Sequence, residues 1–341
     1  DVAAIRALVA LSQPGAARTV PTSSGRLDEA IDEAEEFFLR IRSLLHLENG
    51  RNLNALNHEH QEAVAERFGS PGTQAQSQVE ALMSVYFHHA RIIARVLANA
   101  IKEAHPPSSP EPTKPVSDNL RRDRDGISII DMVRASLQPH TWVRAFQAAI
   151  DECCPVSPET LAFVERHGDR YTSEEFFPTT AERDQFLRLL KPTPGLYDRL
   201  SEMHENGLLG RMFPEFRKVY CRVIRDFYHK YTVDEHTLLT IRNLSALADP
   251  NSTERGRFAS IFAELRQPEL IVLALLFHDT GKWTDKNHAE ESVRMEGGPL
   301  RRLRVPPEDI RTVEFLIRQR LGADGCSGDK TNHDDDTHQQ V

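Results

Sequence analysis

The chain has 341 residues, 39% of them hydrophobic and 7% aromatic, and a formal net charge of −9 at pH 7. This length is compatible with two domains, and the negative charge argues against non-specific binding to nucleic acid or to an anionic membrane. Its four cysteines form no C-x-x-C motif, which is typical of a reducing compartment. No apolar run reaches the ~18 residues of a membrane span. We therefore expect a cytoplasmic protein with neither nucleic-acid nor membrane partners.

The first hundred residues predict an unstructured start followed by three helices. Residues 1–25 are weakly patterned, with Gly, Pro, Ser and Thr clustered at 13–25, and we expect them to be disordered or loosely packed. From Arg26 onward, apolar residues recur every three or four positions, the period of a helix face. The residues of this face are Ile31, Ala34, Phe38, Ile41 and Leu45. A shorter helix with Gly69 as its C-terminal cap and a long helix over 79–104 follow.

The middle of the chain predicts a linker and then short helices. Five prolines fall within residues 105–117, and this density favours an extended linker or a surface loop. Four short amphipathic segments then predict helices over 128–138, 142–154, 157–167 and 180–190. No strand pattern of useful length is visible, so the fold class is predicted to be all-α.

From Tyr197 the sequence predicts further helices over 200–210, over 217–231, and from a capping box at Thr232–Glu235 to about Leu247. The run Leu270–Phe277 is apolar throughout and predicts a buried helix over 270–280 with Gly281 as its cap. After Leu321 almost no apolar residue remains, and we expect residues 322–341 to be disordered.

His236, His278 and Asp279 are the residues of this region that suggest chemistry. His278 and Asp279 follow the apolar run directly, and a buried charge costs several kcal/mol unless it is paired or binds a metal. His236 is expected to face the core side of its helix. Each group taken alone is more often a hydrogen-bonded core residue than a ligand, but two inward-facing groups on separate helices favour a shared metal ion.

These residues carry a resemblance to a known family. His236, followed by His278-Asp279 and Gly281-Lys282, resembles the HD metallophosphohydrolase superfamily. Additional segments closely resemble the bifunctional PII uridylyltransferase/uridylyl-removing enzymes within it. The segments are 37–50, 60–69, 157–160, 207–216, 231–238, 241–244 and 287–292. The resemblance runs from about residue 26 to 321.

The resemblance implies a phosphodiesterase that removes UMP from a uridylylated tyrosine of the nitrogen-signalling protein PII. It implies His236, His278 and Asp279 as ligands of a divalent metal, with Mn, Fe, Co or Zn suited to these donors and Mg as an alternative. Lys282 is predicted either to neutralise phosphate charge or to interact with the C-terminal end of the helix dipole. His288 is predicted to be an outer ligand or a phosphate contact, with a surface histidine as the alternative.

The resemblance also implies a domain organisation. Residues 26–196, including the linker 105–117, resemble the helical C-terminal part of the uridylyltransferase domain, and 197–321 form the HD domain as a helical bundle. The nucleotidyltransferase signature is absent, so we expect a fragment of a larger enzyme. The family carries histidines where this chain has Gln319-Arg320, and no fourth metal ligand is identified. Two alternatives remain open: an HD phosphohydrolase of free nucleotides, and a catalytically incomplete regulatory or docking fragment.

Overall fold

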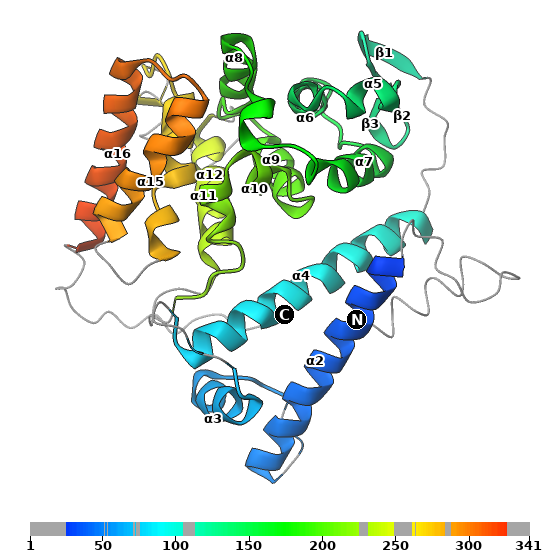
Figure 1. The fold of residues 1–341 in the computed structure, drawn as a ribbon, viewed down its shortest axis with the longest axis vertical. Coiled ribbons are helices and arrows are strands. Elements are labelled where there is room, and N and C mark those ends of the chain that lie inside the picture. The colour runs from blue at the N-terminus through cyan, green and yellow to red at the C-terminus, as the bar shows by residue number, and fades with distance from the viewer. Residues whose placement is uncertain are drawn as a thin grey trace, which may run out of the picture.

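A computed structural model describes residues 25–104 except 51, 53, 71 and 73–75, then 113–224, 231–248, 261–283 except 263, and 288–325. The described chain is helical apart from one small sheet, which confirms the all-α prediction in its main feature (Figure 1). The disorder predicted for residues 1–25 and 322–341 falls outside the described residues, except that Gly25 begins the first described helix and residues 322–325 continue the last one. Among the described residues, no helix has the length and apolar character that crossing a membrane requires.

The first three helices pack together at the lower side of Figure 1. They are α2 (Gly25–Asn49), α3 (His58–Phe68) and α4 (Gln78–Ala104). The predicted face of α2 is confirmed, because Ile31, Ala34, Ile41 and Leu45 are buried and Phe38 is partly buried. Removal of these apolar side chains from water stabilises the group of helices by roughly 1.5–3 kcal/mol for each large residue.

Helix α3 is capped at both ends, and the sequence predicts the C-terminal cap. The Asn57 side chain accepts a hydrogen bond from the His60 amide (3.1 Å) at the N-terminus. Gly69 closes the C-terminus in the left-handed conformation, with φ = +74°, and its amide donates to the carbonyls of Ala65 and Glu66. The predicted end of this helix at Gly69 is therefore confirmed.

A three-stranded antiparallel sheet follows, in the order β1-β2-β3. Its strands are β1 (Lys114–Ser117), β2 (Leu120–Asp123) and β3 (Gly126–Ile129). The prediction of an extended linker through 117 and of a helix from 128 is therefore wrong for these residues, whereas 105–112 lie outside the described chain. Pro115 lies on the edge strand β1, which tolerates a residue without an amide hydrogen.

The remaining described elements pack around one large core. They are α5 (Met132–Ser136), η1 (Pro139–Thr141), α6 (Val143–Asp151), α7 (Pro158–Gly168), η2 (Ser173–Phe176), α8 (Thr180–Leu189), α9 (Leu196–Glu205), α10 (Leu208–Met212), α11 (Pro214–Arg217), α12 (Val233–Ala248), α14 (Glu269–Phe277), η4 (Thr280–Trp283), α15 (His288–Arg302) and α16 (Pro307–Gly325).

The helices predicted over 200–210 and 217–231 also differ from the structure. The helix predicted over 200–210 is divided into α9 and α10 at Asn206-Gly207, where Gly207 has φ = +78°. The helix predicted over 217–231 is wrong for its described residues, because 218–224 form turns and irregular chain. Cys221 adopts φ = +50° there, a conformation that a regular helix does not contain.

The buried apolar residues of the large core run from Leu120 to Ile317. They lie on both sides of the predicted domain boundary at 196/197, and this boundary stays a prediction. Helices α2–α4 bury their apolar residues in two further clusters. Helix α14 lies deep in the large core and packs against α12, α15 and α16.

Candidate metal centre

Helix α14 delivers His278 and Asp279 into the interior of the protein. Residues 270–277 are all buried except Ile271, which is half-buried, as expected for a helix that is apolar on every side. His278 and Asp279 are only 1% and 2% exposed. The helix ends at Phe277 with His278 as its C-terminal cap, and Gly281 lies in η4. The predicted range 270–280 with a glycine cap is therefore wrong.

His236 comes to the same place from the first turn of α12. Its amide donates to the carbonyl of Thr232 (2.8 Å), which starts the helix. Its half-buried imidazole ring lies 6.1 Å from the ring of His278, measured between centroids. Among the described residues, one ligand atom each from His236, His278 and Asp279 lies within 4.8 Å of the other two. Metal bonds of about 2.0–2.2 Å in a tetrahedral site place two ligand atoms about 3.3–3.6 Å apart, so the three groups would move about 1 Å closer together to share one ion.

Hydrogen bonds at His278 favour the tautomer that a metal ligand needs. Nδ1 lies 2.6 Å from the carbonyl oxygen of Leu275 and therefore carries the hydrogen that it donates. Nε2 then has its lone pair available, the usual arrangement when the other ring nitrogen is hydrogen-bonded. Within the described chain, buried Nε2 of His278 and buried Oδ1 of Asp279 make no hydrogen bond. Both donors fit a divalent cation.

Asp279 is ionised in this environment. Burial by itself would raise the pKa of its carboxyl group, but the protonated form of the neighbouring His278 and the ammonium group of Lys282 outweigh burial and hold the pKa well below its usual range in the metal-free site. Oδ2 of Asp279 lies 3.0 Å from Nζ of Lys282 and 3.2 Å from Nε2 of His278. Lys282 thus places a positive charge at the edge of the cluster. Its predicted contact with a phosphate stays a prediction.

Helix α15 fixes the segment that follows the dyad. The amide of Gly281 donates to Oγ of the fully buried Ser292 (2.9 Å). The indole nitrogen of Trp283 donates to Sδ of Met295 (3.0 Å). These contacts hold η4, and with it Lys282, against α15. His288 begins α15, but its side chain lies outside the described residues, and its predicted role stays a prediction.

Sequence reasoning missed a second buried polar group, in the first turn of α12. Asp234, two residues before His236, is fully buried and accepts hydrogen bonds from Arg91, His204 and the amide of Cys221. Burial by itself raises the pKa of Asp234, but His204 and Arg91 outweigh burial and hold the pKa well below its usual range. Arg91 precedes Asp234 by 143 residues, and local sequence pattern carries no signal for such a pair.

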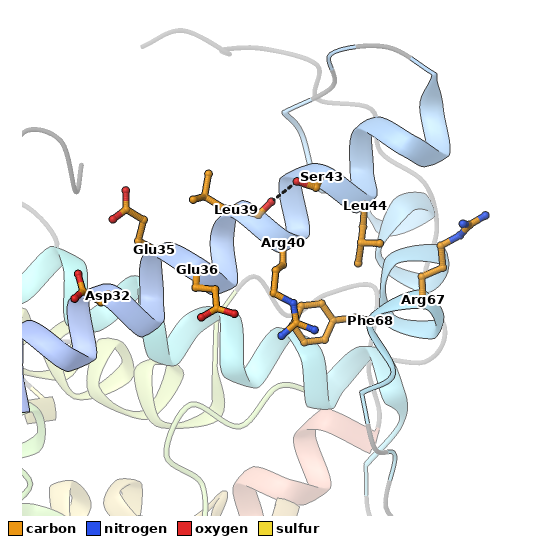
Figure 2. A pocket seen from close by; sticks show the side chains of 9 residues that line it. All are labelled: Asp32, Glu35, Glu36, Leu39, Arg40, Ser43, Leu44, Arg67 and Phe68. Atoms are coloured by element: carbon orange, nitrogen blue, oxygen red, sulfur yellow. Dashed lines mark hydrogen bonds between the residues drawn. The ribbon is translucent and has the colours of Figure 1, made fainter.

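A separate groove of about 520 Å³ lies between α2 and α3 (Figure 2). The Arg40 guanidinium lies over the ring of Phe68, 4.4 Å from its centroid. The groove is lined by Asp32, Glu35, Glu36, Leu39, Arg40, Ser43, Leu44, Arg67 and Phe68. It contains none of the three clustered metal-type ligands, so we do not associate it with their chemistry.

Comparison with known proteins confirms the resemblance. A family model described as GlnD PII-uridylyltransferase matches residues 24–101, which include α2, α3 and nearly all of α4. The chain is 29% identical over 88% of its length to the bifunctional uridylyltransferase/uridylyl-removing enzyme of Bordetella pertussis. Proteins of the same name from Bordetella avium and Methylococcus capsulatus are 30% and 29% identical over 84% and 85% of the chain.

The alignments cover only part of each relative. The chain spans 35% of the Bordetella pertussis protein and 34% of each of the other two. The chain therefore corresponds to about a third of the length of these curated relatives.

Proposed function

We propose, from its relationship to bifunctional uridylyltransferase/uridylyl-removing enzymes, that this chain carries the uridylyl-removing site of such an enzyme. The site would be a metal-dependent phosphodiesterase that releases UMP from uridylylated PII. The transferase activity in the relatives' name would need residues that this chain does not provide, because the nucleotidyltransferase signature is absent from its sequence.

The convergence of His236, His278 and Asp279 within 4.8 Å carries this proposal. The hydrogen bond from Nδ1 of His278 to Leu275 presents Nε2 toward the cluster. Imidazole and carboxylate donors suit Mn, Fe, Co or Zn, with Mg as the weaker match. These three residues would hold the ion, which would supply Lewis-acid polarisation of a phosphoryl oxygen and a water of lowered pKa.

The residues around the cluster have roles of their own in this proposal. Asp279 is already ionised, so it can bind a cation without first losing a proton. Lys282 would stabilise negative charge on the phosphate, since its ammonium group lies beside Asp279. His288, at the start of α15, would contact the metal from outside or the phosphate.

Substitution of a ligand tests the proposed function. We expect His278→Ala and Asp279→Ala each to lower Mn²⁺-supported release of UMP from uridylylated PII by more than about 100-fold, since even outer-shell partners of metals are worth 10–100-fold. The measurement is UMP release under single-turnover conditions with the full 341-residue chain. His46→Ala is the matched control, because its ring contacts Asn54 at the exposed end of α2, and its rate should equal that of the parent.

Loss of less than twofold in both ligand variants would contradict the proposal. Free nucleotide phosphodiesters, assayed in parallel, separate the proposed substrate from the alternative of a nucleotide phosphohydrolase. Hydrolysis of free nucleotides without release of UMP from PII would contradict the proposed substrate and leave the proposed metal site intact.

A further inference from the structure

One face of α4 is docked against the segment that leads into α12. Four side chains at helical spacing lie on this face: Ser84, His88, Arg91 and Arg95. Ser84 accepts a hydrogen bond from the amide of Val223 (3.2 Å), and the His88 ring lies 5.8 Å from that of Tyr220. Arg95 donates to the carbonyl of Glu205 (2.9 Å). The helix that ends the family-model match thus contacts the part of the chain that carries the candidate metal site (Figure 1).

Arg91 makes the deepest of these contacts. Its Nη1 donates to Oδ2 of Asp234 at 2.7 Å, and its guanidinium group lies 5.1 Å from the centroid of the Tyr220 ring. Nη2 lies 3.7 Å from the carboxylate of Glu235. The side chain is only 18% exposed, so solvent screens its charge weakly.

Asp234, in the first turn of α12, accepts hydrogen bonds from three separate segments of the chain. Its Oδ2 accepts from Arg91, from Nε2 of His204 on α9 (2.7 Å) and from the Cys221 amide (3.1 Å). Asp234 is 0% exposed, and an ionised carboxylate in such a position requires these donors. Rotation or translation of this turn would break all three contacts together.

The anchored side of α12 is the side away from the metal cluster. At 100° per residue, Asp234 and His236 point about 200° apart around the helix axis. The donors at Asp234 therefore hold the turn from one side while His236 projects from the other toward His278. The position of the His236 ring is coupled to Asp234 through a single turn of backbone.

We propose that Arg91 is a positioning residue for the metal site. Through Asp234, it sets the first turn of α12 so that the His236 ring meets His278 and Asp279. The N-terminal helices thereby contribute to the assembly of the site without contacting it. This inference rests on the proposed function for its catalytic meaning, but the geometry of His236 is testable without metal.

The test compares Arg91→Met with Arg95→Met in the full chain. Arg95 lies on the same face of α4 and contacts Glu165 and the Glu205 backbone, so it is a matched control. Histidine-selective ¹³C labelling without metal reports the NOE between the rings of His236 and His278, assigned with His236→Gln and His278→Gln. We expect Arg91→Met to lose this NOE and Arg95→Met to retain it.

Mn²⁺ binding by calorimetry is the second readout. Arg91→Met should weaken Mn²⁺ affinity at least about tenfold, the scale of outer-shell losses, and Arg91→Lys should recover part of it. The double variant Arg91→Met/Asp234→Asn removes the unpaired buried charge, so its melting temperature should recover while its Mn²⁺ affinity stays low. This pattern separates positioning from general destabilisation.

The possible results distinguish the two proposals. An unchanged NOE in Arg91→Met, together with Mn²⁺ affinity within twofold of Arg95→Met, would overturn the positioning role and leave the proposed function intact. A parent chain that binds no Mn²⁺ would overturn the proposed function, and the NOE would still decide whether Arg91 positions His236. Recovery of Mn²⁺ affinity with melting temperature in the double variant would show a purely structural role.

Discussion

Three buried acidic residues, Asp234, Asp279 and Glu296, have different surroundings that decide their charge. Asp234 and Asp279 lie beside cationic or hydrogen-bond-donating groups, and their pKa values are held low. Glu296 on α15 is 1% exposed, and within the described chain neither carboxyl oxygen makes a hydrogen bond. Burial, and then the charge of Glu314, raise the pKa of Glu296 to about 8, although Arg318 opposes the shift. Glu296 is therefore mostly protonated at neutral pH.

This raised pKa predicts a particular pH dependence of stability. An unfolded Glu loses its proton near pH 4.3, whereas folded Glu296 keeps it to about pH 8. Because the folded state holds this proton more tightly, protonated Glu296 contributes to the free energy of unfolding. This contribution is fully present below pH ~4.3 and is lost as pH rises to about 8, by up to about 1.4 kcal/mol per pH unit. Glu296→Gln removes this titration, so its free energy of unfolding should fall less between pH 5 and pH 8 than that of the parent.

Urea unfolding at the two pH values measures the difference. Glu66→Gln, at an exposed position on α3, is the matched control and should keep the parent's pH dependence. Equal pH dependence in the parent and in Glu296→Gln would contradict the assignment of a raised pKa to Glu296.

At the scale of elements, the sequence predicted helices better than the strands. Apolar periodicity identified α2, α3, α4, α7 and α8 because each buries one face of a regular helix. The sheet was missed because β2 reads Leu-Arg-Arg-Asp, which has no alternation of apolar and polar residues. The helix predicted over 217–231 is wrong for a tertiary reason, because the Cys221 amide donates to the buried Asp234 instead of continuing a helix.

The turn into β3 gives a prediction at this scale. Gly126 has φ = +118°, and a Cβ there would lie 2.1 Å from the carbonyl oxygen of Pro155. That carbonyl accepts the Ile127 amide (2.9 Å). Gly126→Ala should therefore lower the free energy of unfolding by more than about 3 kcal/mol, because backbone strain and a steric clash add.

Gly69→Ala is the matched control, because Gly69 has φ = +74° but no atom lies within 4 Å of an added Cβ. This variant should cost about 1–2 kcal/mol, the strain of the left-handed conformation alone. Urea unfolding followed by far-UV circular dichroism, which reports the helices of both regions, measures both. Equal losses in the two variants would contradict the close approach of Pro155.

At the scale of the molecule, the sequence predicted which residues meet but not what holds them. His236, His278 and Asp279 were identified because polar groups next to apolar helices need partners, and the structure brings them within 4.8 Å. The link from Arg91 to Asp234 depends on the docking of α4 against the chain before α12. Docking of this kind joins distant segments and leaves no local periodicity, so sequence patterns alone could not reveal it.

The central claim is that His236, His278 and Asp279 bind one metal ion. Electron spin-echo envelope modulation of the chain loaded with one equivalent of Mn²⁺ tests it most directly, because this method detects nitrogen nuclei bound to the ion. We expect modulation from two imidazole nitrogens in the parent and from one in either His236→Ala or His278→Ala. Absence of imidazole nitrogen modulation in the parent, or an unchanged signal in His278→Ala, would contradict the claim.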